Sequence, residues 1–186
     1  MKLLCTSIVA TLALAGTSFG EVVVEDFKLV AGDPENYDRF GYSVSISSDG
    51  TTAIVGANLG DDNGSDSGSA YVYRFDGKNW IETKLLASDA GVYDLFGKGV
   101  AITGNTIIVG AIGDDESNTN TGSAYIYRFD GSDWNFETKL LASDGEQIDV
   151  LGYSVAISEG TIFVAAPYEE DDYSDETSGS VYIYRF

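Results

Sequence analysis

The chain has 186 residues, of which 30 are Asp or Glu and 10 are Lys or Arg, so its formal net charge is −20. Such a polyanion repels nucleic acids and anionic lipids, so we expect no nucleic-acid partner; cations or basic surfaces are its natural complements. The same charge also serves solubility. There is no His, and Cys5 is the single Cys, which removes imidazole and thiol groups from most catalytic and metal-binding hypotheses.

The first elements belong to a targeting segment. Residues 1–20 contain Lys2, an apolar run and then Ser18 and Gly20, the layout of a secretory signal peptide. The run is too short for a membrane span of about 20 residues. We therefore expect a mature domain over 21–186 and a protein that is secreted or held at the cell surface. A retained anchor or an N-terminal strand is the alternative.

One phrase then occurs three times at a nearly constant interval: DRFGYSVSIS from Asp38, DLFGKGVAIT from Asp94 and DVLGYSVAIS from Asp149. Internal repetition of this kind indicates stacked structural units. The units span approximately residues 38–89, 94–144 and 149–186.

Each unit continues with further short pieces rich in β-branched and aromatic residues. They read TTAIVGAN, GSAYVYRF and NWIETKLLAS, then NTIIVGAI, GSAYIYRF and WNFETKLLAS, and finally GTIFVAAP and GSVYIYRF. Their composition is typical of strands. Hairpin turns are predicted at Asp49-Gly50, Asp76-Gly77, Gly104-Asn105, Asp130-Gly131 and Glu159-Gly160. The pattern predicts an all-β fold with about three propeller-type blades, each of four antiparallel strands.

The alternation within strands supports blades over a simple sandwich. In GSAYVYRF, Tyr71, Tyr73 and Phe75 share one side of the strand, while Ala70 and Val72 share the other. A sheet that is apolar on both sides needs cover on both sides, as a blade between two blades has. We expect the strands of the FG phrase to be innermost and the KLLAS strands to be outermost.

Phe-Gly followed by Val-Gly-Ala resembles the FG-GAP repeat of the β-propellers of integrin α-subunits. The motif residues are Phe40, Gly41, Gly56, Ala57, Phe96, Gly97, Gly110, Ala111, Leu151, Gly152, Ala165, Ala166 and Pro167. The resemblance covers nearly all of the predicted mature chain and implies an extracellular recognition role.

The sequence departs from calcium-binding members of that family, which carry a DxDxDG loop between the FG and GAP strands. The corresponding intervals here offer too few alternating oxygen ligands for Ca²⁺. Acidic residues instead follow each GAP strand: Asp61, Asp62, Asn63, Asp66, Asp114, Asp115, Glu116, Asp171, Asp172 and Asp175. These are candidate metal ligands, with solvated turns as the alternative. We expect no cofactor, and calcium binding that is weak, on the order of millimolar.

Three functions are compatible with these patterns. The leading hypothesis is a non-catalytic extracellular binding or adhesion module for a protein or glycan ligand. A polysaccharide-acting enzyme that uses paired carboxylates, or an accessory domain of one, is the alternative. A fragment of a longer propeller protein is the third. Asp38, Asp94 and Asp149 precede the FG phrase in every unit, so we expect turn-capping roles for them, not catalysis.

The ends of the chain predict how the blades close. The third unit stops one strand short, while residues 22–33 contain EDFKLVAGD, which aligns with the KLLASD strands of the other units. Three blades are fewer than the roughly four to eight of closed propellers. One expectation is a homodimer, in which each copy lends residues 22–33 to the last blade of the other to make a six-bladed ring. An open three-blade arc is the alternative.

Overall fold

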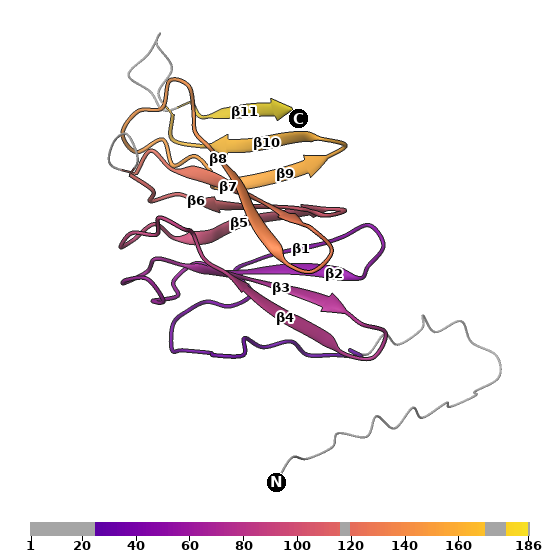
Figure 1. The fold of residues 1–186 in the computed structure, drawn as a ribbon. Coiled ribbons are helices and arrows are strands. Elements are labelled where there is room, and N and C mark those ends of the chain that lie inside the picture. The colour runs from indigo at the N-terminus through magenta and orange to yellow at the C-terminus, as the bar shows by residue number, and fades with distance from the viewer. Residues whose placement is uncertain (1–24, 116–119, 170–177, 186) are drawn as a thin grey trace, which may run out of the picture.

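The structure is a computed structural model that describes residues 25–115, 120–169 and 178–185, and it is a stack of three antiparallel sheets (Figure 1). The strands are β1 (Ser43–Ile46), β2 (Thr52–Ala57), β3 (Ser69–Phe75), β4 (Trp80–Leu85), β5 (Phe96–Thr103), β6 (Thr106–Ala111), β7 (Ser123–Phe129), β8 (Trp134–Leu140), β9 (Ser154–Ser158), β10 (Thr161–Ala166) and β11 (Ser180–Arg185). The described residues contain no helix. The all-β prediction is confirmed.

Each sheet follows the chain from one edge to the other. Blade 1 has the order β1-β2-β3-β4, blade 2 has β5-β6-β7-β8, and blade 3 has β9, β10 and β11. The hairpins turn where Gly, Asp and Asn predicted them, and Gly50, Gly104 and Gly160 all adopt positive φ. The third blade is one strand short, as expected. The KLLAS strands β4 and β8 are outermost in their sheets.

The FG strands of neighbouring blades lie side by side, so β5 contacts both β1 and β9. Between blades 1 and 2, Ala70 and Val72 pack toward Phe96 and the tyrosines of β7. Tyr71 and Tyr73 belong to a separate cluster on the opposite side of blade 1. The predicted two-sided alternation is therefore confirmed, and it is the pattern that lets blades stack.

The FG and GAP motifs meet across each blade joint. Gly97 and Gly152 have φ of 93°, which favours glycine. A Cβ placed on the GAP glycine Gly56 would lie 2.0 Å from the carbonyl oxygen of Gly97, and one on Gly110 would lie 1.9 Å from that of Gly152. The two glycines of the repeat therefore allow one backbone to touch the next. Ala165 occupies the corresponding position in blade 3.

Residues 25–33 lie against blade 1, and the structure assigns no strand to them. The hydroxyl of Tyr73 donates to the carbonyl oxygen of Val30 at 3.0 Å, and Ala31 and Leu29 pack with Tyr71 and Tyr73. The corresponding contact in blade 2 is made by Tyr127, which donates to Leu86 after β4 at 2.9 Å. Residues 25–33 therefore pack on blade 1 in the same way that the residues after β4 pack on blade 2. Its pairing with a third-blade strand stays a prediction.

None of the described residues forms a helix that is long and apolar enough to cross a membrane. The predicted signal peptide, residues 1–20, lies outside the described residues.

Candidate binding site on the acidic loop face

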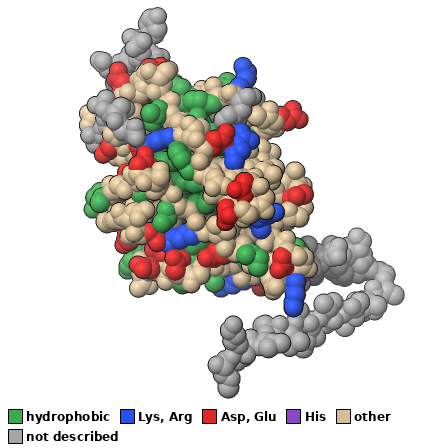
Figure 2. Space-filling view, in the orientation of Figure 1, with side chains coloured by type: hydrophobic (Ala, Val, Ile, Leu, Met, Phe, Trp, Pro, Cys, Tyr) green, Lys and Arg blue, Asp and Glu red, His purple; other side chains and the backbone are tan. Residues whose placement is uncertain are grey.

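The acidic loops of the three blades emerge at the same edge of the stack, on the left of Figure 1. Residues 58–68 join β2 to β3, residues 112–122 join β6 to β7, and residues 167–179 join β10 to β11. Figure 2 shows acidic side chains gathered on the lower left of the same view, with basic side chains among them. We call this surface the acidic loop face.

Several of the loop carboxylates shape the loops themselves. Asp61 accepts a hydrogen bond from the backbone N–H of Asp66 at 2.7 Å, and Asp115 accepts one from Asn120. Asp66 and Asn120 both have positive φ, a conformation that short polar side chains tolerate. The turn function that was the alternative to metal binding is therefore present in both loops.

The aspartates before the FG phrase cap turns, as expected. Asp38 accepts from the backbone N–H of Glu35 at 2.8 Å, and Asp149 accepts from that of Glu146 at 2.6 Å. Asp94 makes the same contact with Gly91 at 2.5 Å. Burial raises the pKa of Asp94 and of Asp149, because the charged form loses hydration.

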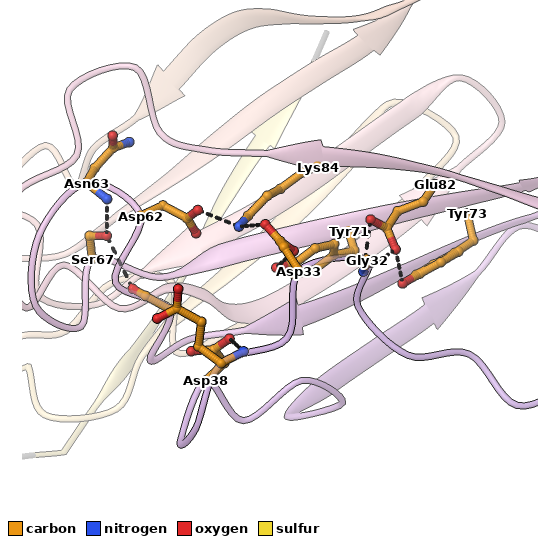
Figure 3. Close-up of polar contacts among 12 residues, drawn as sticks. Gly32, Asp33, Asp38, Asp62, Asn63, Ser67, Tyr71, Tyr73, Glu82 and Lys84 are labelled. Atoms are coloured by element: carbon orange, nitrogen blue, oxygen red, sulfur yellow. Dashed lines mark hydrogen bonds and ion pairs between the residues drawn. The ribbon is translucent and has the colours of Figure 1, made fainter. Parts of the chain in front are cut away.

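A lysine joins two carboxylates in blade 1 (Figure 3). Nζ of Lys84, on β4, lies 2.7 Å from Asp33 and 2.5 Å from Asp62. The hydroxyl of Tyr71 donates to Asp33 at 2.9 Å. The hydrogen bond from Lys84 lowers the pKa of Asp33. Burial acts to lower the pKa of Lys84, but its carboxylate partners more than offset this effect and raise it.

Blade 2 repeats this arrangement with one change. Nζ of Lys139, on β8, lies 2.9 Å from Asp89 and 2.7 Å from Asp114, and the Tyr125 hydroxyl lies within hydrogen-bond distance of both carboxylates, which share its single proton. Asp114 takes the position that Gly60 has in blade 1. The backbone carbonyl of Gly60 accepts from the N–H of Gly68, and that of Asp114 accepts from the N–H of Gly122. The second carboxylate therefore comes from different loop positions in the two blades.

Blade 3 contains the tyrosine and both carboxylates of the site. The Tyr182 hydroxyl lies 2.7 Å from Asp144 and 2.8 Å from Glu169, and the two carboxylates share its single proton. Oε2 of Glu169 is buried and has no hydrogen-bond partner among the described residues. Among the described residues, no lysine contacts Asp144 or Glu169 as Lys139 contacts Asp89 and Asp114.

Of the predicted metal ligands, Asp61, Asp62, Asn63, Asp66, Asp114 and Asp115 lie in the described loops, whereas Glu116, Asp171, Asp172 and Asp175 lie outside the described residues. The described part of the chain brings no group of three or more acidic side chains into a metal-binding arrangement. The prediction of weak calcium binding remains open.

Sequence reasoning did not select Lys84, Lys139, Asp33, Asp89 or Asp144 for the site. Their signal was present, because each KLLASD segment holds a Lys and, five positions later, an Asp. The Asp of one segment pairs with the Lys of the next, one blade along the chain. That pairing only becomes visible when the blades are stacked.

The stacked four-stranded sheets with FG and GAP contacts between them define a repeat protein of the β-propeller type. The sequence model described as "FG-GAP repeat" matches residues 23–73, 80–127 and 134–184, and the chain belongs to that family. Each matched unit begins in an outer-strand segment and ends in the third strand of the next blade, so residues 25–33 are part of the first repeat. No curated protein matches the chain.

Proposed function

We propose that the chain is a non-catalytic extracellular binding module whose acidic loop face binds a positively charged ligand, on a protein or on a glycan. The observation that carries the proposal is that the acidic loops of blades 1 and 2 emerge at one edge of the stack. Asp61, Asp62 and Asp115 are exposed there. Repeated carboxylates on one edge suit a ligand that presents several positive charges.

The internal contacts of the site support a binding role over catalysis. Asp33 and Asp89 are held by a lysine and a tyrosine, and Asp94 is held by the N–H of a turn. The same arrangements recur from blade to blade, which is typical of a structural unit. A glycosidase instead needs one dedicated pair of carboxylates with different pKa values.

The proposal is tested with two cationic probes, poly-lysine and an amine-bearing chitosan oligosaccharide. The loop variant combines Asp61→Asn, Asp62→Asn and Asp66→Asn. Its matched control combines Asp76→Asn, Asp130→Asn and Asp133→Asn, which remove the same charge from the hairpins that precede the outer strands. We expect the loop variant to lose at least about tenfold in affinity, equal to about 1.4 kcal/mol, and the control to lose much less.

Equal losses in the two variants would show that only net charge matters and would contradict a site on the acidic loop face. Release of reducing sugar from neutral or anionic polysaccharides by the unmodified protein would favour the enzyme hypothesis. Secretion forms part of the proposal, and N-terminal sequencing of protein recovered from the medium tests it, with Glu21 as the expected first residue.

A further inference from the structure

The outer face of blade 3 is apolar and open. Phe163, Val181 and Ile183 are 44%, 57% and 53% exposed. The register of the strands places them at the positions of Ile108, Ala124 and Ile126 in blade 2, which blade 3 buries completely. In blades 1 and 2 this face of the sheet packs against the next blade, whereas in blade 3 it is exposed.

The opposite end of the stack presents the complementary face. Val44 and Ile46 on β1 are 69% and 59% exposed, whereas Val100 and Ile102, at the same positions on β5, are 8% and 7% exposed. Blade 1 covers Val100 and Ile102, and nothing in the described residues covers their counterparts to the same extent. The exposed face of blade 1 thus corresponds to the face of blade 2 that packs against blade 1.

Blade 1 already carries part of the packing that an additional neighbouring blade would make with it. Within the molecule, a joint combines a sheet face with the end of the outer strand: Leu140 and Ala142 accompany Ala124 and Ile126 against blade 3. On blade 1, residues 25–33 supply the strand-end part, because Leu29 and Ala31 pack on Tyr71 and Tyr73. The sheet-face part is absent there, and it is what blade 3 presents.

The incomplete polar site of blade 3 points to the same partner. In the KLLASD alignment, Lys28 takes the position of Lys84 and Lys139. Lys28 is exposed. Glu169 and Asp144 are placed on Tyr182 as Asp114 and Asp89 are on Tyr125, and buried Oε2 of Glu169 lacks a donor. A buried carboxylate oxygen without a partner is costly, and a lysine at this position would satisfy it.

We propose that blade 3 of one copy docks on blade 1 and residues 25–33 of a second copy. Residues 25–31 of the second copy pair with β11, and Lys28 of that copy reaches Asp144 and Glu169. The repeat register sets Leu29 opposite Val181, as Leu85 lies opposite Ala70 and Leu140 opposite Ala124. Two such contacts, related by a two-fold axis, close a ring of six blades, within the usual range of about four to eight.

This joint differs from the two internal joints at one point. Ala165 stands where Gly56 and Gly110 allow close approach of the next blade, and a Cβ at those glycines would lie 2.0 and 1.9 Å from the carbonyl oxygen that faces it. The joint between copies is therefore wider around Ala165. Ala165→Gly removes the obstructing methyl group and strengthens the dimer.

The mass of the full secreted chain, measured by sedimentation velocity over a range of concentrations, tests the proposal. We expect a mass of two chains. Ile183→Asp, on the open face, and Lys28→Glu, which sets a carboxylate against Asp144 and Glu169, each weaken the dimer at least about tenfold. Ile81→Asp and Lys78→Glu are the matched controls, because they make the same changes at exposed positions away from the joint, and they leave the dimer intact.

Two further variants make the contact specific. Lys28→Glu combined with Glu169→Lys exchanges the charges and restores the dimer. Leu29→Cys combined with Val181→Cys forms a disulfide between chains on mild oxidation, because opposed residues on antiparallel strands lie within about 4.5–5.5 Å between Cα atoms. Within one chain, β11 lies at one end of the stack and the indigo segment before β1 lies at the other (Figure 1).

A chain that remains monomeric at high concentration would overturn the proposal. So would a dimer that survives both Ile183→Asp and Lys28→Glu, since its contact would lie elsewhere. An open-ended polymer, in place of a species of two chains, would overturn closure of the ring. These outcomes are independent of the ligand proposed for the acidic loop face.

Discussion

Lys84 in blade 1 and Lys139 in blade 2 each form ion pairs with two aspartates, but the pair of Lys139 with Asp114 is the most buried of them. Lys139 is 12% exposed and its partner Asp114 is 5% exposed. Lys84 is 22% exposed, and its partners Asp33 and Asp62 are 55% and 28% exposed. Replacement of each lysine by Met keeps most of the aliphatic stem and removes the charge.

The expected cost follows from what is left behind. Lys139→Met removes the cation that lies 2.7 Å from the buried carboxylate of Asp114, while Tyr125 and Ser123 still donate to that carboxylate. Removal of one partner of a buried ion pair costs about 3–5 kcal/mol, and Asp89 at the rim remains hydrated, so we expect a loss of about 2–4 kcal/mol in the free energy of unfolding. Lys84→Met should cost about 1 kcal/mol or less, because exposed pairs contribute little.

Urea unfolding followed by tryptophan fluorescence and circular dichroism measures both values, provided that the two probes agree and the m-value is unchanged. Lys139→Met combined with Asp114→Asn should recover more than half of the loss, because the amide removes the buried charge and still accepts from Tyr125. A cost for Lys84→Met equal to or greater than that for Lys139→Met would refute the reasoning from burial.

Three further predictions concern the joints and turns. Gly110→Ala places a Cβ 1.9 Å from the carbonyl oxygen of Gly152 and should destabilise the protein by about 1–3 kcal/mol; a urea midpoint equal to that of the unmodified protein would contradict the close contact. Burial raises the folded-state pKa of Asp94 above its unfolded value, so its charge costs stability above that pKa and the cost disappears as the pH falls through it. Asp94→Asn should therefore stabilise the protein at pH 7 and lose this advantage in acid, and the opposite pH trend in thermal unfolding would be inconsistent with the sign. Tyr127→Phe removes a hydrogen bond to a backbone carbonyl and should cost about 0.5–1.5 kcal/mol, as read from the shift in the urea midpoint.

Local chemistry was sufficient to predict the blades. The hairpins followed from Gly, Asp and Asn at turns, since the positive φ that these turns need is available to few residues. The two-sided alternation of Tyr71, Val72 and Tyr73 predicted sheets covered on both faces. The capping role of Asp94 and its two counterparts followed from repetition at one place beside each turn.

The sequence by itself determined the strands, their order within each blade and the family, because these depend on contacts between residues that are near in the chain. Only the tertiary structure decided which side chains meet between blades. Lys84 contacts Asp33 because β4 of one blade and the segment before that blade converge on Tyr71. Oε2 of Glu169 has no hydrogen-bond partner because no lysine of the described residues reaches it as Lys139 reaches Asp114. Such pairings depend on how the sheets stack, and the spacing of residues along one strand does not contain that information.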